Sequence, residues 1–313
     1  MGIASVIGTL VTQASAERLP FSLVVLPDTQ GYTHRYPDVL RAQTRWIRDN
    51  VESKQIAFVL HEGDITNNNL DEEWRLVDEC FSELDGLVPY TLCVGNHDVP
   101  NHGREPHQTR DTTKINEYFP TTRFEGTDWY RGHYGTSNDN HFCTFEAGGL
   151  EFLIVTLQFG PGDDVLEWAN GVIADHPDRR TIVLTHCYMY FDDTRVGPGD
   201  QWSAKGFGGD GNDGEDIWEK LVRRHENIFL VLSGHILGDG LGRQTSTGDH
   251  GNPVHEMLAN YQMLEESGGN GWLRVLTFRP DDGTILVRTY SPWVDASLSD
   301  SQNEFDLTYD MSR

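Results

Sequence analysis

Five short apolar stretches of this 313-residue chain each end in polar residues of the kinds that bind metals or transfer protons. Apolar runs of this length, bounded by Gly, Pro and polar residues, are typical of buried β-strands. In α/β proteins the carboxyl ends of parallel strands share one edge of the sheet, and ligands bind there. The five strand ends therefore predict one shared site. They are Phe21–Leu26 followed by Asp28-Thr29-Gln30, Ile56–Leu60 followed by Asp64, the run through Val94 followed by Gly95-Asn96-His97-Asp98, Thr181–Leu184 followed by His186, and Ile228–Leu232 followed by His235.

Helical periodicity separates the first three of these strands. Residues Tyr36–Val51 and Asp71–Leu84 space their apolar side chains along one helical face. Strands that alternate with helices build a mostly parallel sheet. Near the C-terminus, His255–Tyr261, Trp272–Phe278 and Ile285–Tyr290 predict antiparallel-type strands, and hence a second sheet. The predicted fold is α/β, a four-layer α-β-β-α sandwich of two mixed sheets.

Three further segments complete the predicted organisation. Phe142–Glu146 and Leu150–Leu157 predict a hairpin joined at Gly148-Gly149. Residues 99–142 are polar and show little periodicity, which favours a long surface excursion over the site rather than a second domain. The Gly-rich segment Tyr188–Asp216 is interpreted either as a substrate-facing lid or as a solvated loop.

The run Val94-Gly95-Asn96-His97-Asp98 carries three chemically active side chains in succession. The Asn96 amide is a neutral oxygen ligand, His97 exchanges a proton near neutral pH, and Asp98 can orient an imidazole. Read alone, this run is also an ordinary turn, because Gly, Asn and Asp favour turns. The same arrangement at four other strand ends favours a functional site.

In order and context these motifs resemble the calcineurin-like metallophosphoesterases, over residues 21 to 290. The signature of that family is Asp-x-His, Gly-Asp, Gly-Asn-His-Asp/Glu, a lone His, and Gly-His-x-His. This chain has Asp28-Thr29-Gln30, Gly63-Asp64, Gly95-Asn96-His97-Asp98, His186 and Gly234-His235-Ile236-Leu237. It departs from the signature twice, because Gln30 and Leu237 stand where His is usual, and both departures fall on the same metal site.

The resemblance implies two divalent metal ions, with Mn, Zn or Fe expected. Asp64 would bridge them, since one carboxylate has two oxygens. Asn96, His186 and His235 would complete the second site. Asp28 and the amide oxygen of Gln30 would form a first site that is weak or empty, and a mononuclear centre is the alternative. Spare ligand candidates, each more often an ordinary surface or core residue, are His61, Glu62, Asp239, His250 and His255.

For the catalytic group, the resemblance implies that His97 stabilises developing charge or protonates the leaving oxygen, with Asp98 or Asp64 holding its orientation. Arg243 and Asn67 are the substrate-binding candidates, because Arg pairs well with phosphate oxygens. For both, and for Asn68, Tyr188 and Arg195, an ordinary structural role is the default interpretation.

The predicted function is hydrolysis of phosphoric esters, either phosphodiesters or small phosphomonoesters, by a metal-bound hydroxide. The alternatives are a metal-binding module with lost or altered catalysis, and a hydrolase of a non-phosphorus ester. The formal net charge of −25 argues against nucleic acid as a partner, because phosphate backbones are bound by clusters of Lys and Arg. A small-molecule phosphoester is therefore the expected substrate, and no oligomeric state follows from the sequence.

The N-terminal residues Ile3–Val11 are largely apolar and precede Ala14-Ser15-Ala16, a pattern typical of a signal-peptidase site. Residues 1–16 are therefore predicted to be a signal-peptide remnant, with a disordered terminus as the alternative, and the protein is expected to be secreted or periplasmic. No stretch is long enough for a membrane helix, so no membrane partner is predicted. Residues 17–295 form the predicted domain and 296–313 a C-terminal tail. The four Cys residues are expected to be buried free thiols.

Overall fold

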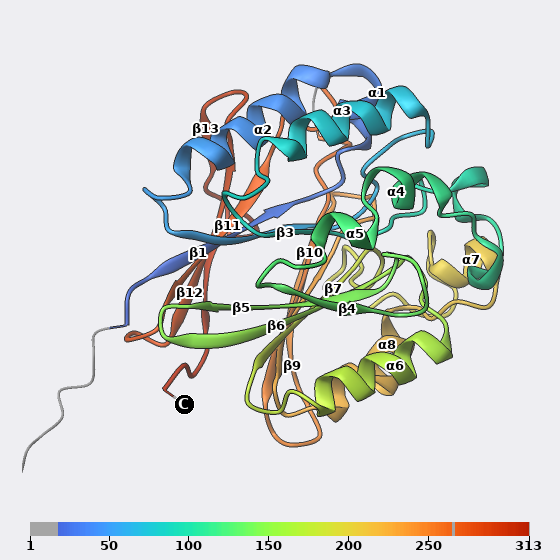
Figure 1. Ribbon diagram of the computed structural model, residues 1–313. Coiled ribbons are helices and arrows are strands. Elements are labelled where there is room, and N and C mark those ends of the chain that lie inside the picture. The colour runs from blue at the N-terminus through green and yellow to red at the C-terminus, as the bar shows by residue number, and fades with distance from the viewer. Residues whose placement is uncertain (1–17, 265–266, 313) are drawn as a thin grey trace, which may run out of the picture.

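The computed structural model describes residues 18–264 and 267–312, so the predicted signal segment lies outside the described residues. Its strands form two seven-stranded sheets that pack face to face, with helices on the outer sides (Figure 1). Helices α1, α2 and α3 lie over the first sheet, and α6 and α8 lie along the outer side of the second. The predicted four-layer sandwich is therefore confirmed.

The first sheet has the order β13-β12-β11-β1-β2-β3, with β14 also paired to β12. The strands β1, β2 and β3 are parallel, and β11 pairs antiparallel with β1. The three parallel strands are almost wholly buried, as expected of a sheet covered on both faces. Their bounds are Phe21–Leu26 for β1, Ile56–His61 for β2, Tyr90–Leu92 for β3, Leu273–Arg279 for β11, Thr284–Ser291 for β12, Ala296–Leu298 for β13 and Glu304–Thr308 for β14.

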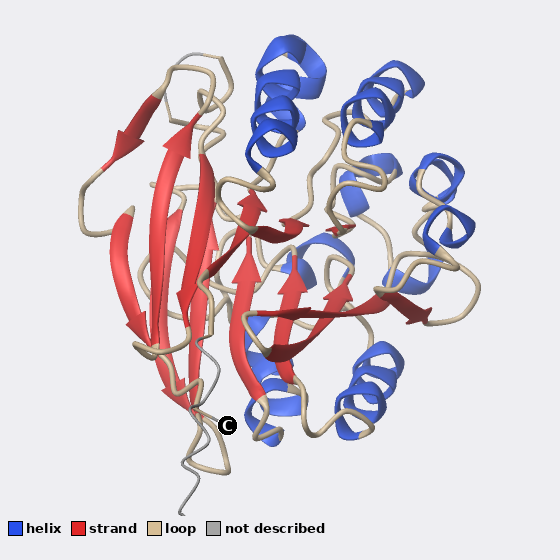
Figure 2. Cartoon of the chain, turned by 60° about the vertical axis from the view of Figure 1, so that its left-hand side comes forward, coloured by secondary structure: helices blue, strands red, loops and turns tan. Residues whose placement is uncertain are grey.

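The second sheet has the order β4-β5-β6-β7-β8-β10-β9. Its central strands β6, β7, β8 and β10 run parallel, whereas β5 and β9 pair antiparallel with their neighbours. In Figure 2 the arrows of several central strands point the same way, so their carboxyl ends lie on one side of the molecule. The bounds are Tyr130–His133 for β4, His141–Ala147 for β5, Leu150–Leu157 for β6, Arg180–Thr185 for β7, Ile228–Ser233 for β8, Leu241–Thr247 for β9 and Pro253–Ala259 for β10.

The outer helices are amphipathic and turn their apolar side chains to the sheets. In α2, Val39, Leu40 and Ile47 are buried, and α3 buries Trp74, Val77 and Phe81 in the same way. The helices are α1 Gln30–Arg35, α2 Pro37–Asn50, α3 Asp71–Ser82, α4 Thr113–Tyr118, α5 Thr121–Phe124, α6 Asp163–Ala174, α7 Ala204–Gly208 and α8 Gly214–Lys220, with 3-10 turns at Pro100–Gly103, His107–Thr109 and Val222–Arg224. In residues 18–264 and 267–312, none of the helices is both long enough and apolar enough to cross a bilayer.

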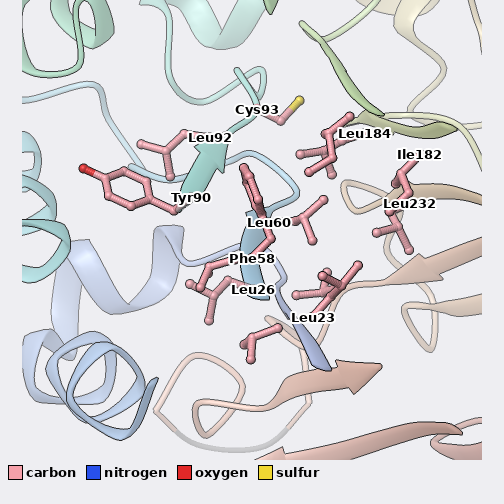
Figure 3. Packing of buried hydrophobic residues seen from close by; sticks show 14 of the residues in the cluster. Leu23, Leu26, Phe58, Leu60, Tyr90, Leu92, Cys93, Ile182, Leu184 and Leu232 are labelled. Carbon is pink, nitrogen blue, oxygen red and sulfur yellow. The ribbon is translucent and has the colours of Figure 1, made fainter. Parts of the chain in front are cut away.

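The main core lies between the two sheets. Figure 3 shows Leu23 and Leu60 of the first sheet facing Leu184 and Leu232 of the second. At one end of this layer Phe21 stacks on Phe278, with ring centroids 4.8 Å apart. Because side chains from both sheets interlock here, the strand ends of the two sheets are held in a fixed relation. That relation positions the site.

Three segments differ in detail from the sequence prediction. Residues 296–308, predicted as part of a tail, contain β13 and β14, which pair with β12 and extend the first sheet. The polar segment 99–142, predicted as a long surface excursion over the site, contains α4, α5 and β4. The strand β9 was not predicted, because its buried positions lie at one end only. All four cysteines are buried and unpaired, as predicted.

Candidate metal centre

Four predicted ligands converge where the ends of the two sheets meet. Asp64 and Asn96 follow β2 and β3 of the first sheet, and His186 and His235 follow β7 and β8 of the second. The Nε2 atom of His186 lies 3.1 Å from Oδ1 of Asp64 and 3.3 Å from Oδ1 of Asn96. The candidate ligand atoms of Asp64, His186 and His235 all lie within 4.8 Å of one another, and the three residues are buried.

Backbone geometry at the strand ends makes this convergence possible. Asp64 and His235 both have a left-handed conformation, with φ of 47° and 69°. Such a conformation costs a non-Gly residue free energy and is concentrated at functional sites. Gly95 lies against Asp64 so closely that a Cβ atom there would overlap the Asp64 backbone nitrogen and side chain. A glycine at position 95 therefore lets the β2 and β3 ends approach each other.

Hydrogen bonds fix the orientation of both imidazoles. Nδ1 of His186 donates to the Glu62 carbonyl at 2.8 Å, which leaves Nε2 directed at Asp64 and Asn96. Nε2 of His235 donates to the Trp202 carbonyl at 2.8 Å, which leaves Nδ1 with a free lone pair. A partner on the second ring nitrogen is what sets the tautomer of a metal-binding histidine.

The charged groups of the centre shift one another's pKa values. Burial alone would raise the pKa of Asp64, but the neighbouring His186 outweighs it and holds that pKa well below its ordinary value. Burial lowers the pKa of His186, whereas Asp64 and Asp28 raise it, with a net rise to about 9. Burial lowers the pKa of His235 to about 3. A proton on His186 therefore supplies positive charge at the point where a divalent ion would supply it.

The donor set fits a transition-metal ion. Two imidazole nitrogens, one carboxylate and one amide oxygen suit Zn, Mn or Fe. Separations of 3.1 to 3.3 Å between donor atoms match the spacing of ligands around an ion at roughly 2.0 to 2.2 Å. Asp64, Asn96, His186 and His235 would hold the ion.

His97 lies beside this centre, but it is oriented differently from the prediction. Its Nδ1 atom donates to the backbone carbonyl of Asn67 at 2.7 Å, and its backbone N–H donates to Asp64 at 2.8 Å. The carboxylate of Asp98 instead accepts from the backbone N–H groups of Gly95, Ile65 and Thr66 and from the Thr66 hydroxyl. Burial, reinforced by the Asp64 charge, raises the pKa of Asp98 to about 6.

Asp98 therefore has a different role from the predicted one. It ties the loop after β2 to the loop after β3, while the Asn67 carbonyl orients the His97 ring. Asn67, predicted to contact substrate, thus acts through its backbone on His97. The side chain of Arg243 is not part of this site, because it packs 4.0 Å over the Phe305 ring and donates to Gln302 and Ser301.

Asp28 and Gln30, predicted for the first metal site, lie next to the centre and are held by amides. Oδ2 of Asp28 accepts from Nδ2 of Asn260 at 2.9 Å and from Nε2 of Gln262 at 3.4 Å, and the His235 backbone N–H also donates to this carboxylate. Nε2 of Gln30 donates to Oε1 of Gln262. Burial raises the pKa of Asp28 well above its ordinary value, although His186 opposes the rise.

The spare ligand candidates lie in other surroundings. His61 is buried behind the centre, where Nδ1 accepts from the Gly63 N–H at 3.1 Å and Nε2 lies 2.9 Å from the Thr29 hydroxyl. His255 lies between Thr245 and Thr308, and His250 donates to the Arg224 carbonyl. None of these, nor Glu62 or Asp239, belongs to the metal-ligand cluster found within residues 18–264 and 267–312.

A pocket of about 300 Å³ opens onto the centre. Asp64, Asn96, His97 and His235 line its floor, so metal ligands and the proposed acid share one cavity. Of the other lining residues, Gln30 and Leu237 were singled out from the sequence, and Trp202 and Phe207 lie in the Gly-rich segment interpreted as a lid or a loop. The sequence reasoning missed the remaining four, which are His102, Arg104, Gln262 and Met263.

Two of the missed residues, Asn260 and Gln262, could have been found from their position in the sequence. Asn260 and Gln262 follow β10, which pairs parallel with β8 and so has its carboxyl end beside His235. The rule that found the other five strand ends applies to this sixth one.

His102 stacks on His97, with ring centroids 4.2 Å apart, and Gly103 packs against Asn96. No pattern in the polar segment after Asp98 distinguished these two residues.

Comparisons with known proteins identify relatives in sequence and in fold. The chain is 32% identical over 305 residues to the uncharacterised protein YvnB of Bacillus subtilis (strain 168), a match that covers 93% of this chain and 22% of that protein. The chain thus spans about a fifth of the length of this relative.

Solved structures show the same fold. A dimetal phosphatase from Danio rerio superposes with a TM-score of 0.53 at 16% identity, covering 92% of this chain and 99% of that one. The purple acid phosphatase PPD1 from yellow lupin (Lupinus luteus) seeds gives a TM-score of 0.54 at 13% identity, covering 94% of this chain and 55% of that one. The calcineurin-like phosphoesterase family model matches residues 21–239, a span that contains all six of the predicted metal ligands. The chain belongs to the calcineurin-like phosphoesterase family.

Proposed function

We propose that this protein is a metal-dependent hydrolase of small phosphoric esters. The observation that carries the proposal is the convergence of Asp64, Asn96, His186 and His235 on one point, next to a pocket that three of these ligands and His97 line. A bound divalent ion would neutralise phosphoryl oxygens and make water a better nucleophile at neutral pH. The chain's own residues then have to bind the ester, orient it and supply a proton.

His97 is the residue best placed to supply that proton. Its Nδ1 atom is committed to the Asn67 carbonyl, so Nε2 is the ring nitrogen that remains for the substrate. Stacking against His102 restrains the ring plane. A fixed imidazole beside the reacting phosphorus would protonate the leaving oxygen or stabilise charge on the phosphoryl group.

Arg104 replaces Arg243 as the candidate for substrate binding. Its guanidinium lies 5.2 Å from the centroid of the Phe207 ring, and both residues line the pocket. It is exposed, in a protein whose formal net charge is −25. A cation at the mouth of this pocket would attract a phosphoester and bind its oxygens. The volume of about 300 Å³ suits a compact ester rather than a polymer.

The test is hydrolysis of a chromogenic phosphodiester and its monoester in excess Mn²⁺. We expect His97→Ala to lower kcat by roughly 10² to 10⁴-fold, the usual contribution of a general acid, while the bound metal is retained. Arg104→Ala should raise KM about 10- to 150-fold, since a charged hydrogen bond contributes about 1.5 to 3 kcal/mol. His250→Ala, at an exposed histidine outside the site, is the matched control.

Unchanged turnover in His97→Ala would contradict the proposed role of this residue. No turnover of either ester by the wild-type protein, with metal bound, would favour the metal-binding module. Turnover of a carboxyl ester alone would favour the hydrolase of a non-phosphorus ester.

A further inference from the structure

The carboxylate of Asp28 is surrounded by three side-chain amides, Gln30, Asn260 and Gln262, which we name the amide cluster. Asn260 and Gln262 donate hydrogen bonds to Oδ2 of Asp28. Gln262 also accepts a hydrogen bond from Gln30, so the three amides and the carboxylate form one connected group. Asn260 lies beside β10 and Gln30 begins α1, so the cluster joins the two sheets.

In this group, N–H donors face the buried Asp28 carboxylate where a cation could otherwise compensate its charge. Asp28 is buried, and a buried carboxylate needs either a counter-charge or several N–H donors. Two amides and the His235 backbone N–H provide such donors. Among the described residues, Oδ2 of Asp28 accepts from all three donors, whereas Oδ1 accepts only from the shared His235 N–H. An ion at Asp28 would therefore have to displace these donors from Oδ2 or bind through Oδ1 alone.

The remaining donors at this position are poor ligands. Leu237 presents only carbon, and no imidazole or thiolate belongs to the amide cluster. Oε1 of Gln30 is buried and has no hydrogen-bond partner within the described residues, so it is one oxygen left for a ligand. A hard cation takes six or more oxygen ligands, and a transition metal prefers imidazole or thiolate, so one amide oxygen holds neither.

The pocket that opens onto the centre exposes most of the proposed ligands but not Asp28. Asp64, Asn96 and His235 line it, together with Gln30, Leu237 and Gln262. Asp28 and His186 are not among the lining residues of this described cavity. An ion entering the pocket would thus meet three of the four proposed ligands directly.

We propose that the centre binds one transition-metal ion, at Asp64, Asn96, His186 and His235, and that the amide cluster replaces a second ion. The inference rests on the proposed metal-dependent function. It assigns Asp28 a positioning role, in which the carboxylate accepts directly from the His235 backbone N–H and is itself held by the amide cluster. It also separates this chain from the usual dinuclear signature at positions 30 and 237, where His is usual.

The first experiment counts ions. Protein is loaded with Mn²⁺ or Zn²⁺, desalted, and analysed by mass spectrometry for metal content. We expect one ion per chain with either metal, and an electron paramagnetic resonance spectrum of isolated Mn²⁺ without exchange coupling. The Asp28→Asn variant should keep its single ion, because Asp28 is not a ligand. Two ions in the wild-type protein, or loss of the ion in Asp28→Asn that remains folded by circular dichroism, would overturn the inference.

A double variant tests what excludes the second ion. Gln30→His combined with Leu237→His supplies two imidazoles beside Asp28 and breaks the link between Gln30 and Gln262. It should bind a second Mn²⁺ and show the spectrum of a coupled pair, whereas the control Gln30→Asn combined with Leu237→Met should stay at one ion. A double-His protein that still binds one ion would overturn the role given to these two positions.

These results separate the inference from the proposed function. Two ions per chain together with phosphoester turnover would overturn the inference and leave the function intact. One ion per chain without turnover would overturn the function and leave the inference intact.

Discussion

The two halves of the centre are built by the same architecture from different residue types. One half, at Asn96, His186 and His235, presents imidazole nitrogens and an amide oxygen to a shared point, and we call it the imidazole half. The other half consists of Asp28 and the amide cluster, and we call it the amide half. In both halves the residues follow parallel strands. Asp64 lies between the two.

Backbone geometry brings a side chain to the centre in both halves. Whether that side chain can bind an ion depends on its own donor atoms. In the imidazole half one nitrogen of each ring is hydrogen-bonded to a carbonyl, which leaves the other nitrogen for an ion that would take the place of the His186 proton. In the amide half the N–H groups of Asn260 and Gln262 point at Oδ2 of Asp28. Under the proposal of a single ion, hydrogen-bond direction decides which half binds it.

Gly95→Ala would disrupt both halves at once and should have the largest effect. A Cβ atom at this position would overlap the backbone and the carboxylate of Asp64, the residue that the two halves share. The neighbours are backbone atoms and a buried side chain, so we expect a loss of about 1 to 3 kcal/mol in unfolding free energy. Metal binding should be lost as well. Chemical denaturation and metal analysis measure the two effects.

Gly171→Ala is the matched control for that variant. Gly171 is exposed within α6, and a Cβ atom there would meet no other atom within 4 Å. Alanine favours the helix, so this variant should gain roughly 0.5 to 1 kcal/mol and keep its metal. If Gly95→Ala bound metal as tightly as the Gly171→Ala protein, close packing of the two strand ends would not be what positions Asp64.

One substitution in each half compares what the two halves contribute to metal binding. We expect His186→Ala to weaken Mn²⁺ binding by a hundredfold or more, since even the loss of a group behind a ligand costs about 10- to 100-fold. Gln262→Ala removes one donor from Asp28 and should change the affinity by less than about tenfold, the lower end of that range. Isothermal titration calorimetry compares them. Equal losses in the two variants would show that the amide half also coordinates the ion.

Much of the imidazole half was predictable from the sequence because each ligand follows a continuous apolar run. Such runs are strands buried on both faces, and their register leaves the next polar residue at the sheet edge. Asn260 and Gln262 of the amide half were missed for a related reason. Residues His255–Tyr261 were interpreted as an antiparallel-type strand, whereas β10 pairs parallel with β8 and antiparallel with β9.

Other features depend on contacts that no local pattern contains. Arg104 and Arg243 are both arginines near Gly residues, and only the tertiary fold places the first over Phe207 in the pocket and the second over Phe305 outside it. The role of Asp98 was misassigned because a His-Asp pair suggests orientation of the ring. In the structure, the neighbouring backbone N–H groups bind that carboxylate first.

His141 provides a contrast to the imidazoles of the centre. Nearby carboxylates raise the pKa of His186, whereas burial lowers the pKa of His141 to about 4. His141 lies at the start of β5, where Nδ1 donates to the Asn138 carbonyl at 2.9 Å and the ring also bonds to the Thr91 hydroxyl of β3. It therefore links the two sheets in its neutral form.

The sign of the pH effect follows from this lowered pKa. An unfolded chain binds a proton at His141 below about pH 6.5, but the folded protein does so only below about pH 4. Stability from the neutral ring is therefore complete above pH 6.5 and is lost as the pH falls towards 4, by on the order of 3 kcal/mol. His141→Gln should be less stable than wild type at pH 7, and the gap should shrink on acidification. Urea unfolding of both proteins at several pH values measures it, with His250→Gln as the exposed control. A gap that stayed constant with pH would mean that His141 titrates alike in the folded and unfolded states, and the contrast with His186 would then be confined to the metal centre.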